Sequence, residues 1–307
     1  YLEKCSAAST GFRRNAITTV ELIQRAIAHC LQADHIRDRE TTQFVIELLS
    51  DILTAFADDR EQLQHMQSVC AKCGGQRLVV DTLCARPDSE LFQQCLSLAS
   101  LLLKPNNKEV QMIFSNYFVK IDDYQLWNLL REMIGAVTSN VKPVRQLKKV
   151  LRHAGAAGEV ELTADEKESL GNFSASVTTL KHAARFMQLL CEGHNMAFQR
   201  YVKQQVDNSY SINFLDVFAG VCIGLCKNEA AADACDEEDV ACMSICFELL
   251  SEATTRPDSE NQFYLANDSG IVLCAVKVLA ARFSQLRRLC GRSCYPEQVR
   301  ELKEQAS

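Results

Sequence analysis

The chain has 307 residues, of which 47% are hydrophobic and 23% are charged, and its formal net charge is -6. This composition argues against a disordered chain, because it supplies enough apolar surface for a substantial core. The negative charge argues against a general nucleic-acid binder, whose affinity would rest on clustered Lys and Arg. With five prolines and twelve glycines, turn signals are few, so helices should dominate.

The fifteen cysteines lie mostly inside apolar helical runs and not in a short, loop-rich framework. We therefore expect reduced thiols in a cytosolic setting. The longest apolar run near the middle, 217–226, has about half the length that a membrane span needs, so no transmembrane segment is expected. The chain begins at Tyr1 without a leader, and we expect it to be a piece of a longer protein.

The N-terminal half shows the helical period repeatedly. Val20, Ile23 and Ile27, for example, fall on one face of a helix. Short polar corners such as 104–107 separate the apolar runs. The unit is therefore a helix, a short corner and another helix. The longer helices of this half are expected at 17–31, 41–56, 91–103, 109–118 and 124–134.

An internal echo supports this unit. Residues 101–111 align with 189–199, matching the double Leu, the Asn at position seven and the Gln at position eleven. Such a repeated corner is typical of stacked helical pairs, which bury their apolar faces only against neighbouring pairs. We therefore predict an all-α fold, an armadillo/HEAT-like alpha-solenoid of stacked helical pairs.

Residues 137–172 differ in composition from what surrounds them. Basic residues between 142 and 152 are followed by acidic ones between 159 and 168. Charge runs usually form exposed surfaces, so we predict a flexible charged linker. It would separate an N-terminal helical-repeat domain, 1–136, from a C-terminal helical domain, 173–307. The alternative is that 142–152 forms a helix for a partner or an anionic surface.

Helices resume after this segment, and an acidic stretch interrupts them. Residues 228–239 lack the alternating acidic ligands and turn glycine of an EF-hand, so a solvated loop is expected there. The helices are predicted at 176–191, 196–206, 212–226, 240–252 and 270–290.

Cys70 and Cys73 have the spacing of a zinc ligand pair, but no second pair follows at zinc-finger distance. The pairs 222/226 and 242/246 lie on apolar helix faces, where buried thiols are the expected interpretation and a zinc site is the alternative. No nucleophile elbow, phosphate-binding glycine loop or metalloprotease motif is present. We therefore do not expect an enzyme.

The corner at 189–199 carries the most distinctive chemistry. Gly193 is suited to end one helix and Asn195 to cap the next, which leaves Glu192 and His194 at the tip. Glu252 lies at the end of a later helix. Two carboxylates at the ends of stacked helices could share a hard cation. The alternative is that both glutamates face water.

The run 186–195, followed by Phe198, Gln199 and Tyr201, resembles the helical domain shared by ryanodine receptors and inositol trisphosphate receptors, the intracellular calcium-release channels. The resemblance continues from Phe247 to Ala266 in compatible order. Upstream, 75–79 and 107–111 resemble the preceding helical homology domain of the same channels.

The resemblance implies a cytosolic regulatory solenoid that couples ligand signals to the pore. It also implies a calcium-sensing site formed by Glu192, His194 and Glu252, which a channel region absent from this chain would complete. The family commonly has Gln three residues after the second Glu, where this chain has Thr255. Thr255 is therefore a candidate ligand with a shorter side chain.

The implied partners are other domains of the same channel, assembled as a homotetramer on the cytosolic face of an intracellular calcium-store membrane, the endoplasmic reticulum. The competing interpretation is a generic helical-repeat scaffold that binds proteins and has no ion role. Calcium dependence in the longer protein distinguishes the two.

Overall fold

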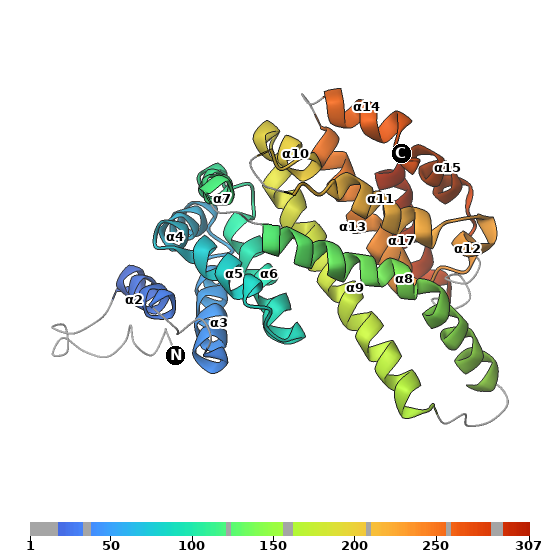
Figure 1. Cartoon of the computed structure of the whole chain (residues 1–307), viewed down its shortest axis with the longest axis horizontal. Coiled ribbons are helices and arrows are strands. Elements are labelled where there is room, and N and C mark those ends of the chain that lie inside the picture. The colour runs from blue at the N-terminus through green and yellow to red at the C-terminus, as the bar shows by residue number, and fades with distance from the viewer. Residues whose placement is uncertain are drawn as a thin grey trace.

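The computed structural model describes residues 18–32, 38–120, 124–155, 162–206, 210–255, 259–283 and 291–307. Every regular element within these ranges is an α-helix. Successive helices pack against one another across the molecule, from α2 at one end to α15 and α17 at the other (Figure 1). The predicted all-α solenoid is confirmed.

The N-terminal helices begin where the sequence supplies side-chain caps. The hydroxyl of Thr18 accepts from the Glu21 N–H at the start of α2, and Asp59 and Asp88 cap α4 and α6 in the same way. Their apolar stripes are buried against neighbouring helices. These helices are α2 (Thr19–Leu31), α3 (Arg39–Ala55), α4 (Arg60–Lys72), α5 (Gly75–Cys84), α6 (Ser89–Leu103) and α7 (Lys108–Lys120).

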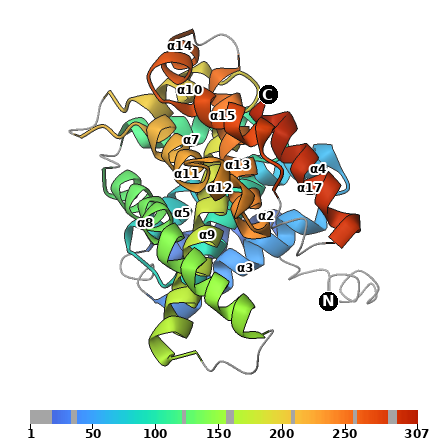
Figure 2. The ribbon, with the colours of Figure 1, turned by 90° about the vertical axis from the view of Figure 1, so that its right-hand side faces the viewer.

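Two long helices, α8 (Tyr124–Gly155) and α9 (Ala164–Cys191), lie side by side and project from the body together (Figures 1 and 2). Helix α9 also packs against α6 and α13, so it connects the two halves of the core. The remaining helices are α10 (Met196–Lys203), α11 (Phe214–Leu225), α12 (Glu229–Asp233), α13 (Glu237–Thr254), α14 (Ser259–Asn267), α15 (Ile271–Ala280) and α17 (Gly291–Ala306).

The prediction of a flexible linker at 137–172 is wrong for the residues that the structure describes. Helix α8 runs to Gly155, and α9 begins at Ala164 behind a capping box between Thr163 and Glu166. The apolar residues Val141 and Val144 are buried, which holds this part of α8 on the body. Of the predicted linker, only 156–161 lie outside the described residues. The division into two domains stays a prediction.

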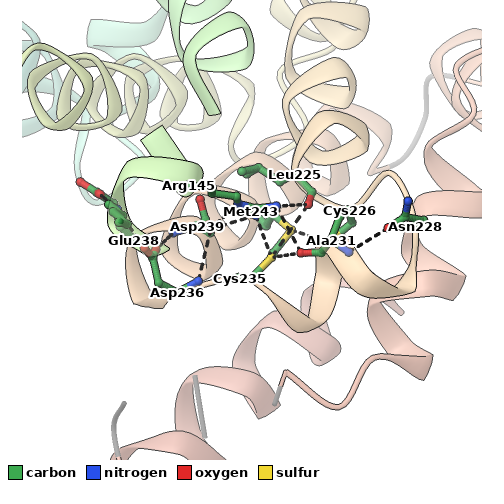
Figure 3. A network of polar contacts seen from close by, with 11 residues as sticks. Arg145, Leu225, Cys226, Asn228, Ala231, Cys235, Asp236, Glu238, Asp239 and Met243 are labelled. Carbon is green, nitrogen blue, oxygen red and sulfur yellow. Dashed lines mark hydrogen bonds and ion pairs between the residues drawn. The ribbon is translucent and has the colours of Figure 1, made fainter. Parts of the chain in front are cut away.

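The charged residues of this segment are not simply solvated either. Arg145 donates to Asp239 at 2.8 Å, and Lys148 donates to Asp236 at 2.8 Å and to Glu238 at 3.0 Å (Figure 3). The expected solvated loop at 228–239 instead contains α12 and the start of α13. The basic and acidic segments therefore neutralise each other across about ninety residues of sequence.

The C-terminal region differs from expectation in its boundaries. The helix predicted at 270–290 ends at Ala280, and residues 284–290 lie outside the described part of the chain. Helices α14 and α17 were not predicted. The sequences of both helices are mostly polar and lack the apolar periodicity that identified the other helices.

Within the described ranges, no one helix combines the length and the apolar composition of a membrane span. Helices α14 and α15 meet that criterion only when they are taken together, and the chain bends by 66° at the break between them.

Candidate functional site

The first corner of the candidate site connects α9 to α10. Gly193 and His194 both adopt left-handed backbone, with φ of 70° and 63°. The predicted left-handed turn at Gly193 is confirmed. The predicted cap by Asn195 is wrong, because its side-chain amide donates back to the Leu190 carbonyl at 2.9 Å. Asn195 therefore holds the end of α9 and not the start of α10.

Gly193 is required at this corner for a second reason. A Cβ at this position would lie 2.7 Å from Asn106 Oδ1, so any other residue would collide with that side chain. Asn106 belongs to the preceding corner, between α6 and α7, and it has left-handed backbone too, with φ of 49°. In the internal echo Asn106 aligns with His194. The left-handed residue of one corner thus packs against the next corner.

The second corner of the candidate site is the end of α13. Glu252 lies in the last turn of this helix, and the backbone N–H of Gly193 lies near enough to its carboxylate to lower its pKa. Helices α9 and α13 pack against each other along their length. The charge of Glu192 acts on the Glu252 carboxyl, so the structure places the two corners close together. The role of these residues as ligands stays a prediction.

The two carboxylates disfavour each other's charge. Burial raises the pKa of the Glu252 carboxyl above its ordinary value, and the nearby charge of Glu192 raises it further. The N–H of Gly193 and the side chain of His194 lower this pKa by less. One carboxylate oxygen of Glu192, Oε2, is buried and has no hydrogen-bond partner in the described part of the chain. A buried carboxylate oxygen without a partner is costly, which makes this corner favourable for a cation.

The other two predicted site residues differ in placement. His194 is exposed and close enough to Glu252 to influence its pKa. The hydroxyl of Thr255 donates to the Ser251 carbonyl of its own helix at 2.8 Å. Its hydroxyl proton is therefore directed along its own helix, and the contacts of Thr255 do not join it to the carboxylates.

The residues present fit a hard cation only in part. Carboxylate oxygens are the ligands that calcium prefers, and Glu192 and Glu252 supply them from separate rigid helices. Asn106 adds an amide oxygen that is buried and lacks a partner among the described residues. However, no group of three or more His, Cys, Asp or Glu side chains within those residues is arranged to hold a metal. The described chain thus offers part of a coordination sphere.

Asn106 was not among the residues predicted for the candidate site. Its role depends on how one corner stacks on the next, which neither periodicity nor composition reveals. The signal that could have found it was the internal echo, since Asn106 and His194 occupy the same position of the repeated corner.

The cysteine pairs do not form a comparable site. Cys222, Cys226, Cys242 and Cys246 are buried among apolar side chains, as expected. Burial raises the pKa of the Cys70 thiol to about 12.

The raised pKa of Glu252 predicts a pH-dependent stability. Glu252 binds its proton more tightly in the folded chain, so its contribution is fully present below the unfolded pKa of about 4.5 and is lost as pH rises through the higher folded value. Glu252→Gln should therefore gain stability relative to the wild type as pH rises towards 7, by less than about 1 kcal/mol because solvent screens both groups.

Urea unfolding at a series of pH values measures this difference. The exposed Glu168 of α9 provides a matched control, because Glu168→Gln makes the same substitution at a distance from Glu192 and Glu252. Equal pH profiles for Glu252→Gln and the wild type would contradict the prediction.

Stacked helical pairs of this kind define a class of protein, the α-solenoids. Residues 174–279 match the family model described as "RyR and IP3R Homology associated". This part of the chain is therefore similar to a region associated with ryanodine receptors and inositol trisphosphate receptors. The matched residues include both corners, and they confirm the resemblance found in the sequence. The description is that of a channel region and not of an enzyme family.

Proposed function

We propose that this chain is a cytosolic regulatory solenoid of an intracellular ligand-gated calcium-release channel. In this proposal Glu192, His194 and Glu252 form part of a calcium-sensing site. Thr255 contributes only if its hydroxyl turns away from Ser251. A region of the channel absent from this chain completes the coordination sphere.

The observation that carries this proposal is the meeting of the Glu192 and Glu252 corners. The pKa of Glu252 is raised by burial and by Glu192, and Glu192 Oε2 is buried without a partner in the described residues. Bound calcium would supply the positive charge that these carboxylates lack. The two glutamates would keep their carboxylates ionised and hold them on rigid helix ends.

The site lies where it can transmit a signal. Glu192 ends α9, which packs against α6, α8 and α13, so a change at the corner reaches both halves of the solenoid. A ligand shifts a conformational equilibrium only through its differential affinity for two states. We infer that calcium favours the arrangement in which the completing region docks on this corner, within a homotetramer at the cytosolic face of the endoplasmic reticulum membrane.

Calcium titration of channel opening in the longer protein tests this function. Glu192→Gln and Glu252→Gln each remove one ionised ligand while preserving side-chain size, and each should raise the half-activating calcium concentration by tenfold or more, as expected for loss of a charged ligand. Glu168→Gln, distant from the corner on an exposed face of α9, should leave activation unchanged. Unaltered activation in both corner variants would refute the assignment.

A protein-interaction scaffold is the second candidate, because α15 exposes an apolar surface. Val272, Leu273 and Val276 of this helix are exposed, and exposed apolar patches often mark binding surfaces. This role alone predicts no calcium dependence in the longer protein. It also predicts that Val276→Glu would abolish partner binding while the corner variants leave it intact.

A further inference from the structure

One side-chain contact recurs at three successive corners of the solenoid. In each case a buried glutamine donates from Nε2 to two backbone carbonyls, three residues apart, at the end of a helix. The last carbonyls of a helix lack the regular backbone donor four residues on, so the glutamine supplies each with a donor. The Glu252 carbonyl also accepts from the Thr255 N–H at 3.3 Å. Gln67 of α4 binds Leu101 and Lys104, Gln111 of α7 binds Leu189 and Glu192, and Gln199 of α10 binds Glu252 and Thr255.

Two of these glutamines hold the corners of the candidate site. Gln111 donates to the Glu192 carbonyl at 3.0 Å. Gln199 donates to the Glu252 carbonyl at 2.9 Å and to the Thr255 carbonyl at 2.8 Å. The backbone of each candidate glutamate is therefore fixed by an amide from another helix.

Gln199 has a special place among the three. It lies on α10, the helix that leaves the Glu192 corner, and it grips the end of α13 that carries Glu252. Its side chain is fully buried. Asn261 of α14 reinforces the contact by donating to the Gln199 carbonyl at 2.7 Å and to the Ala253 carbonyl at 3.0 Å. One amide thus connects the two halves of the site.

We propose that Gln199 is a positioning residue for cation binding, which sets the separation of the Glu192 and Glu252 carboxylates without touching the ion. This inference rests on the proposed function. Groups that orient metal ligands typically affect affinity by about ten- to a hundredfold when they are removed. Gln199 acts through the backbone of α13, because its contacts are with the carbonyls of Glu252 and Thr255 and not with their side chains.

The chain contains its own control. Gln67 makes the same pair of contacts at the end of α6, it is equally buried, and that helix end carries Asn106 but neither of the two candidate carboxylates. Gln199→Leu and Gln67→Leu remove the same pair of Nε2 hydrogen bonds to carbonyls at a helix end. Gln67→Leu also removes the hydrogen bond that Gln67 Oε1 accepts from Asn107 Nδ2 at 2.9 Å. Both should lower the melting temperature, and only Gln199→Leu should weaken calcium binding.

The experiment is thermal unfolding of the 307-residue chain in increasing calcium chloride, with magnesium chloride as the ionic-strength control. A ligand that binds only the folded state raises the free energy of unfolding by RT ln(1 + [L]/Kd), and the melting temperature rises with it. We expect Gln199→Leu to need a calcium concentration about ten- to a hundredfold higher than the wild type for the same rise in melting temperature. Gln67→Leu should follow the wild-type dependence from a lower starting temperature.

The possible results separate the positioning role of Gln199 from calcium binding itself. Equal calcium dependence in the two variants would overturn the positioning role and leave the calcium site intact. No calcium-specific rise in the wild type at any concentration would show that the part of the site in this chain does not hold calcium, and would overturn this inference, whereas the proposed function is tested separately in the longer protein. If circular dichroism shows that Gln199→Leu does not fold, Gln199→Asn and Gln67→Asn form the deciding pair, since Asn keeps the amide but shortens its reach.

Discussion

Replacing Arg145 by Leu is expected to destabilise the chain by about 3–5 kcal/mol, the cost of leaving a buried charge without its partner. The guanidinium donates to Asp239 from Nε at 3.0 Å and from Nη2 at 2.8 Å. Only 4% of the Asp239 side chain is exposed. The Leu225 and Ala231 carbonyls also accept from Nη1, at 3.1 and 3.2 Å, so the variant strands three acceptors at once.

Urea unfolding followed by circular dichroism measures the loss. The matched control is Arg39→Leu, since Arg39 pairs with Asp88 at the surface, where the side chains are 54% and 43% exposed. Surface pairs contribute about 0–1 kcal/mol. The double variant Arg145→Leu with Asp239→Asn should lose less than the sum of the single changes, because the neutral amide needs no counter-charge. A similar cost at Arg145 and Arg39 would contradict the prediction.

The Arg145 network also shows where sequence reasoning fails. The basic run at 142–152 and the acidic run at 228–239 were each interpreted as solvated, because local composition does not indicate what a charge faces in the fold. Their pairing depends on the packing of α8 against α11, which brings Arg145 and Lys148 to the start of α13, a tertiary arrangement. The apolar residues Val141 and Val144 were the local sign that this stretch packs.

The helical layers and corners were more predictable, because they follow from short-range chemistry. Apolar periodicity placed most of the helices, and Gly193 marked the turn between α9 and α10. The position of Glu192 and Glu252 at helix ends was visible in the sequence. Their proximity was not, since it depends on the stacking of α9 on α13, and the prediction that they meet came from the family resemblance.

The repeated corner at 101–111 and 189–199 contains a Gln whose role could not be predicted from the sequence alone. Its shared Gln is the residue that holds the next helix end, as Gln111 and Gln199 show. A glutamine inside a helix has no fixed role in sequence, because its amide can face water or a carbonyl with equal ease. Only the packing of α7 on α9 and of α10 on α13 assigns it one.

Phe118→Ala is expected to cost about 3–5 kcal/mol, the usual penalty for removing a fully buried aromatic ring. The Phe118 ring lies 5.1 Å from the Trp127 ring, 5.9 Å from Phe198 and 6.1 Å from Tyr201, measured between centroids. These residues come from α7, α8 and α10. The cavity would therefore open where three helices converge, directly behind the helix that carries Gln199.

Trp127 is the single tryptophan of the chain, so its fluorescence reports the loss of the neighbouring Phe118 ring directly. Trp127 Nε1 donates to the Tyr201 hydroxyl at 3.0 Å, so loss of the Phe118 ring should change Trp127 fluorescence before global unfolding. Phe44, whose side chain is 64% exposed, is the control, and Phe44→Ala should cost less than about 0.5 kcal/mol.

The same variant tests whether the aromatic cluster supports the candidate site. Phe198 and Tyr201 hold α10 against α7 and α8, and α10 in turn holds the end of α13 through Gln199. Phe118→Ala should consequently weaken calcium-dependent stabilisation at temperatures where the chain is still folded, whereas Phe44→Ala should not. An unfolding midpoint close to that of the wild type would show that the ring is not part of the core that positions α10.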